Sequence, residues 1–506
     1  MFDARRDDLV AAVAGAGTMG RGIVQVLAQC GVRTLVYDAR PGAAAEAKSA
    51  IDAALARLVA RGRLEAQARE RALARIAPVD ALEAFAPAQL VVEAIVEELD
   101  AKQELFRALE AIVAAECVLA TNTSSLSVTR LAAACRRPER VAGWHFFNPV
   151  PLMRVVEVVA GERTDARACA ALAALAERFG HTPVRCRDTP GFVVNHAGRG
   201  YVPEALRLLA EGIADFATID RILVDAAGFR MGPFALMDLV GLDVNHAVQK
   251  SFYEQYFHEP RFRPFHFLEV RVAAGLLGRK TGRGWYRYDG DRAELPPEAP
   301  PPAERARTVW VEPQAGDVRE LLTRLGAAVQ ADGRPTPEAV CFVAPIGEDA
   351  TSAALRLGLD ATRTVAVDPL FGFARRRTLM TTPRTHPDVR AAAHGLLAAD
   401  GTPVSVIRDS PGFVAQRVVA QIVNIACDIV QQGIAAPADL DRAVVLGLNY
   451  PQGPLAMGDA LGPAKVLAIL EALHALYREP RYRPSPWLVR RARLGLSLLA
   501  PEGLDA

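Results

Sequence analysis

A glycine-rich turn near the start of the chain has the spacing of a dinucleotide-binding motif. The run Gly15-Ala-Gly-Thr-Met-Gly20 follows an apolar strand at 10–14 and precedes a helical apolar pattern over 23–29. In this motif the first glycine makes the tight turn, the second admits the pyrophosphate, and the third allows close helix packing. Glycine turns also occur for plain steric reasons, so the motif alone is weak. Its predicted cofactor contacts are Gly15, Gly17, Thr18, Met19 and Gly20.

The acid at the end of the next strand strengthens this interpretation and selects the cofactor. Asp38 ends the predicted strand 34–38, about 20 residues beyond the turn, where an acid accepts hydrogen bonds from the adenosine ribose. A carboxylate at that position repels a 2′-phosphate. The sequence therefore predicts NAD rather than NADP, with the phosphates at the N-terminus of the following helix.

Three later runs carry side chains that could transfer a proton or hold a reacting oxygen. They are Thr121-Asn-Thr-Ser-Ser-Leu126, Trp144-His-Phe-Phe-Asn-Pro149 and Val155-Val-Glu-Val-Val159. A lone histidine beside two phenylalanines is more often a packed core residue than a catalytic one. Glu157 could lie exposed at a sheet edge, but a carboxylate flanked by four valines is costly unless it has a partner. We therefore expect Glu157 to be partnered.

Together with three more runs, these motifs resemble the 3-hydroxyacyl-CoA dehydrogenase family. The further runs are Asp188-Thr-Pro-Gly-Phe-Val-Val-Asn195, 230–243 and Lys280-Thr-Gly-Arg-Gly-Trp-Tyr286. The resemblance covers about residues 7–290, and its helical part is matched again in the second half. Six motifs in the right order are hard to obtain by accident. The resemblance implies NAD-dependent oxidation of an L-3-hydroxyacyl-CoA to the 3-oxoacyl-CoA by hydride transfer from C3.

The resemblance also implies roles for individual residues. His145 is the expected general base, and the ordinary histidine pKa of about 6.5 suits that task. Glu157 would orient its ring, while Ser124 and Asn195 would bind the substrate oxygen. The alternative is a structural role for each residue, in which Ser124 caps a helix and Asn195 closes a turn. Glu97 and Lys102 match family positions near the nicotinamide-ribose end of the cofactor, and Ser124 and Asn148 are further expected cofactor contacts.

The second half repeats the first at an offset near 221 residues, without its chemistry. Asp409-Ser-Pro-Gly-Phe-Val matches the run at 188–193, but Asn195 is replaced by Gln416. The segment that matches His145 reads Val365-Ala-Val-Asp-Pro369, without histidine. The Lys-Thr-Gly ending is absent as well, and the role of that ending in the first half stays open between phosphate contact and domain packing. We expect one active site per chain. A further departure is His196, where the family commonly has arginine.

Strands alternating with alanine-rich helices predict a Rossmann-like, largely parallel, doubly wound sheet, followed by a helical domain. A proline-rich stretch beginning at Glu294 indicates a linker. The fold class is therefore α/β plus all-α, with a degenerate Rossmann-like domain and a second helical domain in the second half. The predicted parts are an NAD-binding domain 1–187, a helical domain 188–290, a linker 291–308, a degenerate domain 309–405 and a catalytically silent helical domain 406–506.

Composition agrees with an enzyme that acts on small molecules. The 506 residues are 51% hydrophobic and 23% charged with a formal net charge of +1, so no nucleic-acid partner is indicated. No apolar run approaches the roughly 20 residues of a membrane span. Seven scattered cysteines without a CxxC pair predict reduced thiols in the cytoplasm and no metal site.

The expected partner is an acyl-CoA substrate, 3-hydroxybutyryl-CoA or 3-hydroxyadipyl-CoA, in fatty-acid or phenylacetate catabolism. We expect the second helical domain to pack on the first as an internal pseudo-dimer, in a chain that is a monomer or a homodimer. Two alternatives remain. One is a related hydroxy-acid dehydrogenase, which would commonly use a lysine, and the other is a non-enzymatic, crystallin-like NAD-binding protein.

Overall fold

The computed structural model describes residues 1–331 and 333–502. The chain divides into two compact units, one of residues 1–196 with 432–449 and one of residues 197–431 with 450–506. Residue 332 of the predicted degenerate domain and residues 503–506 of the predicted last domain lie outside the described residues. The boundaries of the five predicted parts stay predictions.

The first unit is built on an eight-stranded sheet in the order β3-β2-β1-β4-β5-β6-β7-β8. All neighbouring strands run parallel except β6 and β7, so the expected doubly wound, largely parallel sheet is present. Strands β3 and β8 were not predicted, because β3 is three residues long and β8 alternates polar and apolar side chains. The strands are β1 (Val10–Ala14), β2 (Arg33–Tyr37), β3 (Ile76–Pro78), β4 (Leu90–Glu93), β5 (Val118–Thr121), β6 (Val141–Phe146), β7 (Val155–Ala160) and β8 (Thr182–Arg187).

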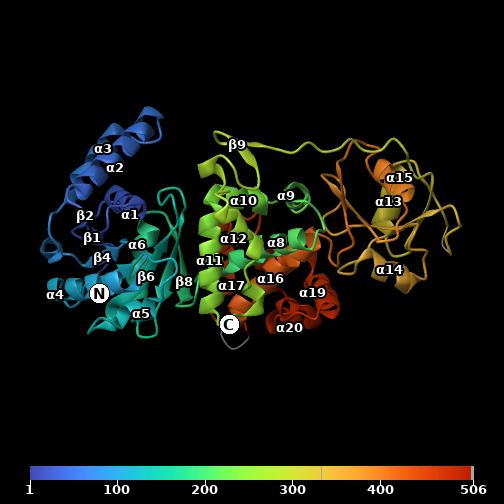
Figure 1. Ribbon diagram of the computed structural model, residues 1–506. Coiled ribbons are helices and arrows are strands. Elements are labelled where there is room, and N and C mark those ends of the chain that lie inside the picture. Colours follow the sequence, from blue (N-terminus) through green and yellow to red (C-terminus); the bar gives the residue numbers. More distant parts are fainter. Residues whose placement is uncertain (332, 503–506) are drawn as a thin grey trace. The chain divides into compact units, whose positions relative to one another are not determined.

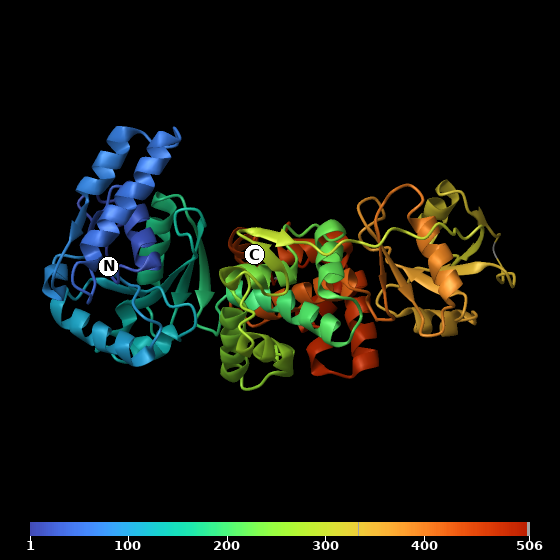
Figure 2. The same cartoon turned by 45° about the horizontal axis from the view of Figure 1, so that its top comes forward.

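Helices cover this sheet because their apolar residues recur at helical spacing. In α1 the side chains of Ile23, Val24 and Leu27 are fully buried in the core, which places the glycine turn at the end of β1. Helices α2 and α3 pack against each other and extend beyond the sheet as a hairpin (Figures 1 and 2). The helices of the unit are α1 (Thr18–Gln29), α2 (Ala43–Ala60), α3 (Ala66–Ala74), α4 (Leu99–Ile112), α5 (Val128–Ala132), α6 (Ala166–Arg178), α7 (Val194–Ala197) and α17 (Pro437–Leu448).

The second unit contains most of both predicted helical regions, and residues 188–196 and 432–449 of them belong to the first unit. Helix α16 is buried along almost its whole length and contacts α8 of the first helical region (Figure 1). The expected packing of the second helical region on the first is therefore present. The α-helices are α8 (Val202–Ala210), α9 (Phe216–Asp225), α10 (Pro233–Val240), α11 (Leu242–Gln255), α12 (His266–Ala273), α16 (Ala415–Gln431), α18 (Pro454–Leu461), α19 (Pro463–Tyr477) and α20 (Pro486–Leu494), and a β9 (Arg287–Asp289)–β10 (Arg292–Glu294) hairpin follows α12.

Buried charges join these two helical regions. The Arg417 guanidinium, on α16, donates to Glu204 on α8 at 2.6 Å, and Arg481 donates to the other Glu204 oxygen at 2.8 Å. Arg417 also pairs with Glu211 at 2.7 Å. His196, the counterpart of Arg417 in the first repeat, is buried. The arginine of this motif is thus present in one repeat only.

The second α/β region lies in the same unit and has six strands in the order β12-β11-β13-β14-β15-β16. Strands β14 and β15 are antiparallel and the other pairs are parallel. The expected Rossmann-like character is therefore present. Its elements are β11 (Thr308–Val311), α13 (Gly316–Arg324), β12 (Ala328–Val329), β13 (Val340–Val343), α14 (Ala350–Leu357), β14 (Thr364–Val367), β15 (Arg377–Thr381), α15 (Pro387–Leu397) and β16 (Val404–Ile407).

Among the described residues, no single helix has both the length and the hydrophobicity to cross a membrane. Only α18 and α19 taken together reach those limits, and they meet at a bend of 95°. All seven cysteines are free, as expected, and six of them are buried.

Candidate active site

The glycine turn has the shape that a dinucleotide requires. Gly15 has a φ of 108°, which favours glycine, and a Cβ on Gly15 or Gly20 would overlap a neighbouring carbonyl oxygen. A Cβ on Gly17 would meet no atom within 4 Å. Gly15 and Gly20 therefore serve the local fold. Gly17 leaves open space beside the N-terminus of α1, where backbone N–H groups can hold phosphates. The residues fit a bound NAD.

Asp38 directly follows β2 and lies beside the glycine turn. Its Oδ2 accepts a hydrogen bond from the Ala16 N–H at 2.7 Å, and its Oδ1 accepts one from the Arg40 N–H at 2.9 Å. The carboxylate is therefore held next to the phosphate-binding turn, at the position that the sequence predicted for a contact with the adenosine ribose.

His145 and Glu157 are directly opposite each other on the antiparallel strands β6 and β7. The His145 Nδ1 and the Glu157 Oε2 are 2.6 Å apart, so the expected partner of Glu157 is present. The other oxygen, Oε1, accepts hydrogen bonds from the N–H groups of Val193 and Val194 at 2.9 and 2.8 Å. Glu157 is fully buried, and these three contacts satisfy a carboxylate that would otherwise be costly to bury.

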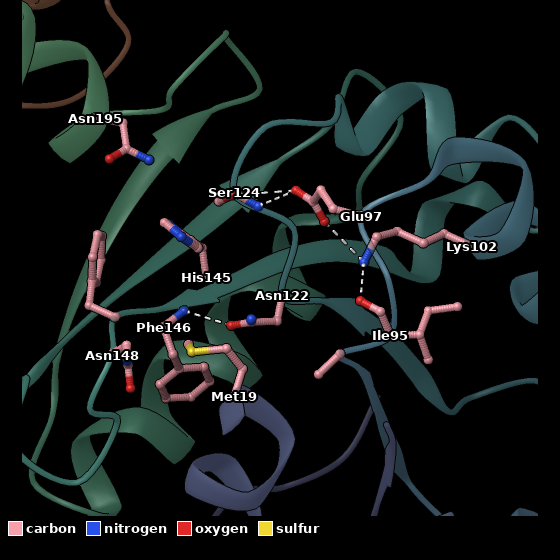
Figure 3. Close-up of a pocket in the computed structure, with 12 residues that line it drawn as sticks. Met19, Ile95, Glu97, Lys102, Asn122, Ser124, His145, Phe146, Asn148 and Asn195 are labelled. Atoms are coloured by element: carbon pink, nitrogen blue, oxygen red, sulfur yellow. Dashed lines mark hydrogen bonds and ion pairs between the residues drawn. The ribbon is translucent and has the colours of Figure 1, made fainter. Parts of the chain in front are cut away.

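The imidazole faces a cleft of about 340 Å³ at the carboxyl end of the sheet. Figure 3 shows Ser124, His145 and Asn195 turned toward the same opening, with Met19 of the glycine turn on its border. The cleft therefore adjoins both the predicted cofactor turn and the predicted base. It is lined by Met19, Ala94, Ile95, Glu97, Lys102, Asn122, Ser124, His145, Phe146, Phe147, Asn148 and Asn195.

Glu97 organises the loop that carries Ser124. Its Oε1 accepts hydrogen bonds from the Thr123 hydroxyl at 2.7 Å, the Ser124 N–H at 2.9 Å and the Ser125 hydroxyl at 2.9 Å. Its Oε2 lies 3.2 Å from the Lys102 ammonium. Burial favours the protonated acid, but the Thr123 hydrogen bond and the Lys102 charge outweigh it and lower the pKa of Glu97. The carboxylate therefore stays ionised at the border of the cleft (Figure 3).

Two residues of this region were not singled out from the sequence. Glu93 is fully buried at the end of β4, and its Oε1 lies 2.5 Å from the Lys102 ammonium. Asn122 accepts a hydrogen bond from the Phe146 N–H at 2.9 Å, which joins the ends of β5 and β6 beside His145. The cost of a carboxylate in an apolar strand, which indicated a partner for Glu157, applies equally to Glu93. No comparable signal was available for Asn122.

The structure brings most of the predicted residues together. Glu97, Lys102, Ser124, His145, Asn148 and Asn195 all line the one cleft with Met19, and Glu157 lies behind it. Gly15, Gly17, Thr18, Gly20 and Asp38 belong to the adjoining turn and are not part of the lining. A dinucleotide-binding turn next to an imidazole held by a buried carboxylate defines the class of NAD-dependent oxidoreductases that remove a hydride from a carbinol.

Comparison with known proteins identifies the family. Residues 10–189 match the family "3-hydroxyacyl-CoA dehydrogenase, NAD binding domain", and residues 191–288 and 412–498 each match the corresponding C-terminal domain. The chain therefore belongs to the 3-hydroxyacyl-CoA dehydrogenase family, its first domain is an NAD-binding domain, and the C-terminal domain of the family occurs in it twice.

Individual relatives agree over nearly the whole chain. The chain is 40% identical over 485 residues to the 3-hydroxyadipyl-CoA dehydrogenase of Escherichia coli K12, covering 96% of this chain and 97% of the relative. A crystal structure of a 3-hydroxybutyryl-CoA dehydrogenase from Escherichia coli K12 superimposes with a TM-score of 0.85 at 39% identity, covering 96% and 98% of the two chains. A probable 3-hydroxybutyryl-CoA dehydrogenase of Deinococcus radiodurans is 42% identical over 276 residues, which is 99% of that protein and 54% of this chain.

Proposed function

We propose that this chain oxidises the C3 hydroxyl of an L-3-hydroxyacyl-CoA to the 3-oxoacyl-CoA with NAD, using His145 as the general base. The observation that carries the proposal is the buried His145–Glu157 pair in a cleft that begins at the glycine turn. Membership of the family supports the reaction class.

The residues of the cleft suit separate tasks. With Nδ1 held by Glu157, His145 has Nε2 left to take the hydroxyl proton, and the carboxylate stabilises the imidazolium that forms. Asn195 and Ser124 would hydrogen-bond the substrate oxygen as it becomes a carbonyl. Glu97 and Lys102 would hold the nicotinamide ribose, and Asn148, which also lines the cleft, would contact the cofactor as well. NAD, when bound, supplies the acceptor of the C3 hydride.

A second cleft supports the proposal that the substrate carries coenzyme A. It has a volume of about 560 Å³, lies between α1, α2 and the 148–152 loop, and shares Asn148 with the first cleft. Arg21, Arg57 and Arg61 line it, and among the described residues no side-chain hydrogen bond or ion pair occupies them. Three arginines in a cleft suit the phosphates of coenzyme A.

For the acyl group of the substrate we propose two candidates. Relatives are named for 3-hydroxybutyryl-CoA and for 3-hydroxyadipyl-CoA, so a short monocarboxylic and a dicarboxylic chain are both candidates. Either would place the enzyme in cytoplasmic fatty-acid or phenylacetate catabolism. We further propose one active site per chain, in a chain that is a monomer or a homodimer.

A steady-state assay tests the proposal. NADH oxidation is followed with acetoacetyl-CoA and with free acetoacetate, and the expected result is turnover of the thioester with little of the free acid. Turnover of free hydroxy acids alone would favour the other dehydrogenase class, and NAD binding without turnover of any of them would favour a non-enzymatic protein. A panel of short, long and dicarboxylic 3-hydroxyacyl-CoA esters then selects the acyl group by kcat/KM.

A further inference from the structure

A segment of the catalytically silent second repeat belongs to the same compact unit as the active site. Residues 432–449 cluster with residues 1–196, and helix α17 in that segment packs against β7 and β8. The Arg187 N–H, at the end of β8, donates to the Ile434 carbonyl at 3.0 Å. The buried face of α17 carries Leu440, Ala443 and Val444. The strand that carries Glu157 is therefore covered by a helix from the other half of the sequence.

Gly447, in the last turn of α17, packs tightly against Val194. A Cβ added to Gly447 would lie 2.9 Å from Val194 Cγ1 and 3.1 Å from Cγ2. Val194 is fully buried, so its side chain has little room to move. Glycine within a helix costs roughly 1 kcal/mol relative to alanine, and the close approach explains why this position has no side chain. At the offset of 221, the matching residues of the other repeat are Ala226 and Ala415.

From Val194 the contacts lead directly to the predicted base. The Val194 N–H donates to Glu157 Oε1 at 2.8 Å, and Glu157 Oε2 holds His145 Nδ1 at 2.6 Å. Val194 also precedes Asn195, which lines the cleft. A displacement of the Val194 backbone would therefore disturb both the carboxylate that orients the imidazole and the asparagine that faces the substrate.

We propose that α17 of the second repeat is a positioning element for the His145 site, and that it acts through the contact of Gly447 with Val194. Gly447 and Val194 are positioning residues, because neither touches the reacting atoms. The second repeat thus has no chemistry of its own but is needed for the geometry of the first. The kinetic part of the test rests on the proposed function, and a spectroscopic part does not.

The main variant is Gly447→Ala in the full-length chain. It should fold, because alanine favours the helix, while its methyl group pushes on Val194. We expect kcat with acetoacetyl-CoA and NADH to fall roughly 3- to 30-fold, with the KM for NADH within about twofold of wild type, because small misplacements of a catalytic group are costly. Adding Val194→Ala should restore kcat to within about threefold of wild type, which a general loss of stability would not do.

A matched control is Gly458→Ala in α18, also in the second repeat. A Cβ there would lie 2.5 Å from Leu498 Cδ1 and 2.8 Å from Val423 Cγ1, but Gly458 belongs to the other compact unit. It should lower the melting temperature and leave kcat near wild type. If both glycine variants lower kcat equally, or if Gly447→Ala retains wild-type kcat, the proposal is wrong.

Two further measurements keep the outcome decisive. Val194→Ala alone opens a gap opposite Gly447 and should also lower kcat, so unchanged kcat in a folded Val194→Ala variant would overturn the proposal even if Gly447→Ala were insoluble. The downfield proton resonance of the His145–Glu157 hydrogen bond, identified by its loss in His145→Gln, should shift in Gly447→Ala and stay in place in Gly458→Ala. A shift in a protein that does not reduce acetoacetyl-CoA would reject the proposed function and support the positioning role.

Discussion

The two α/β regions each reverse their strand order at one strand, and the residues that follow it differ. In the first region the order is β2-β1-β4, and β1 is followed by Gly15 and open space at Gly17. In the second it is β12-β11-β13, and β11 is followed by Glu312, whose carboxylate accepts a hydrogen bond from the Ala344 N–H at 3.2 Å. Glu312 also pairs with Arg356 at 3.2 Å. The turn after β11 therefore lacks the glycine spacing that lets a dinucleotide approach the first turn.

The antiparallel strand pair differs in the same sense. Where β6 and β7 pair His145 with Glu157, β14 and β15 pair Val365 with Thr381. Gln416, at the position of Asn195, spends its amide on the Gly347 N–H, the Pro345 carbonyl and Asp368. The amide of Gln416 is thus fully hydrogen-bonded within the protein.

What the regions share is structural. Asp188 accepts hydrogen bonds from the first N–H groups of α5, and Asp409 does the same for α14. Phe192 and Phe413 both have a positive φ, of 47° and 49°, after the same Pro-Gly pair. These caps and turns occur in both copies, whereas the proposed catalytic side chains occur in one.

The largest expected effect is a loss of turnover on substitution of His145, the proposed base of the first region. His145→Gln should lower kcat by roughly 10² to 10⁴ while leaving NADH affinity near wild type, because it removes the base but not the cofactor turn. Stopped-flow turnover and NADH fluorescence titration measure the two quantities. Val365→Ala, at the matching position of the second region, should leave kcat within about twofold. Equal losses in the two variants, or full activity in His145→Gln, would refute the assignment.

The sequence could predict many of the residues that line this cleft because they belong to local motifs. The glycine turn, the His145 run and the valine-flanked Glu157 each carry a signal within a few residues. The antiparallel placement of β7 could not be read in the same way, since strand direction depends on how the chain crosses the sheet. Asn122 and the contact of Gly447 with Val194 were also out of reach, because they join residues that are distant in the sequence and ordinary in type.

A smaller effect concerns the two helical repeats, which share their helices but not Arg417. Burial opposes the ionised form of Glu204, but the charges of Arg417 and Arg481 outweigh it and lower its pKa to about 2. Glu204→Gln leaves these guanidinium groups without that charge and should cost about 3 kcal/mol of unfolding free energy at pH 7. Urea unfolding measures the loss, and Glu211→Gln, at a partly exposed partner, should cost less.

The pH dependence of this pair has a definite sign. A carboxylate with a lowered folded-state pKa contributes its stability above the ordinary glutamate pKa and loses it as the pH falls through the folded value. The difference between wild type and Glu204→Gln should therefore shrink as the pH falls from about 4.5 toward 2. A difference that stays constant over this range would mean that the charge of Glu204 is not what stabilises the helical pair.

The next effect concerns cofactor binding, and it compares Asp38 of the first region with Gln330 of the second. Asp38→Ala should raise the KM for NAD by about tenfold and relax the rejection of NADP, because one charge-assisted hydrogen bond to the ribose is lost together with the repulsion of a 2′-phosphate. Gln330, which follows β12 as Asp38 follows β2, bonds Thr336 instead. Gln330→Ala should leave both constants unchanged. An Asp38→Ala enzyme with unaltered cofactor preference would remove Asp38 from the site.

The smallest expected effect is at Asp368, which the duplication matches to Asn148. Burial raises the pKa of Asp368 to about 6, and hydrogen bonds from Gln416 and the Leu370 N–H offset only part of that cost. Because the folded-state pKa is raised, the penalty is absent below about pH 4 and complete above about pH 6. Asp368→Asn should therefore stabilise the chain by about 1 to 2 kcal/mol at pH 7.5 in urea unfolding, and by nothing at pH 4.

The reverse substitution separates burial from residue type. Asn148 is exposed, so a carboxylate there can stay hydrated and Asn148→Asp should not change the unfolding free energy at either pH. It should instead weaken NAD binding, because the new charge lines the cleft that begins at the glycine turn. If Asp368→Asn gave the same stabilisation at pH 4 as at pH 7.5, the gain would come from packing, and the buried charge would not distinguish the two regions.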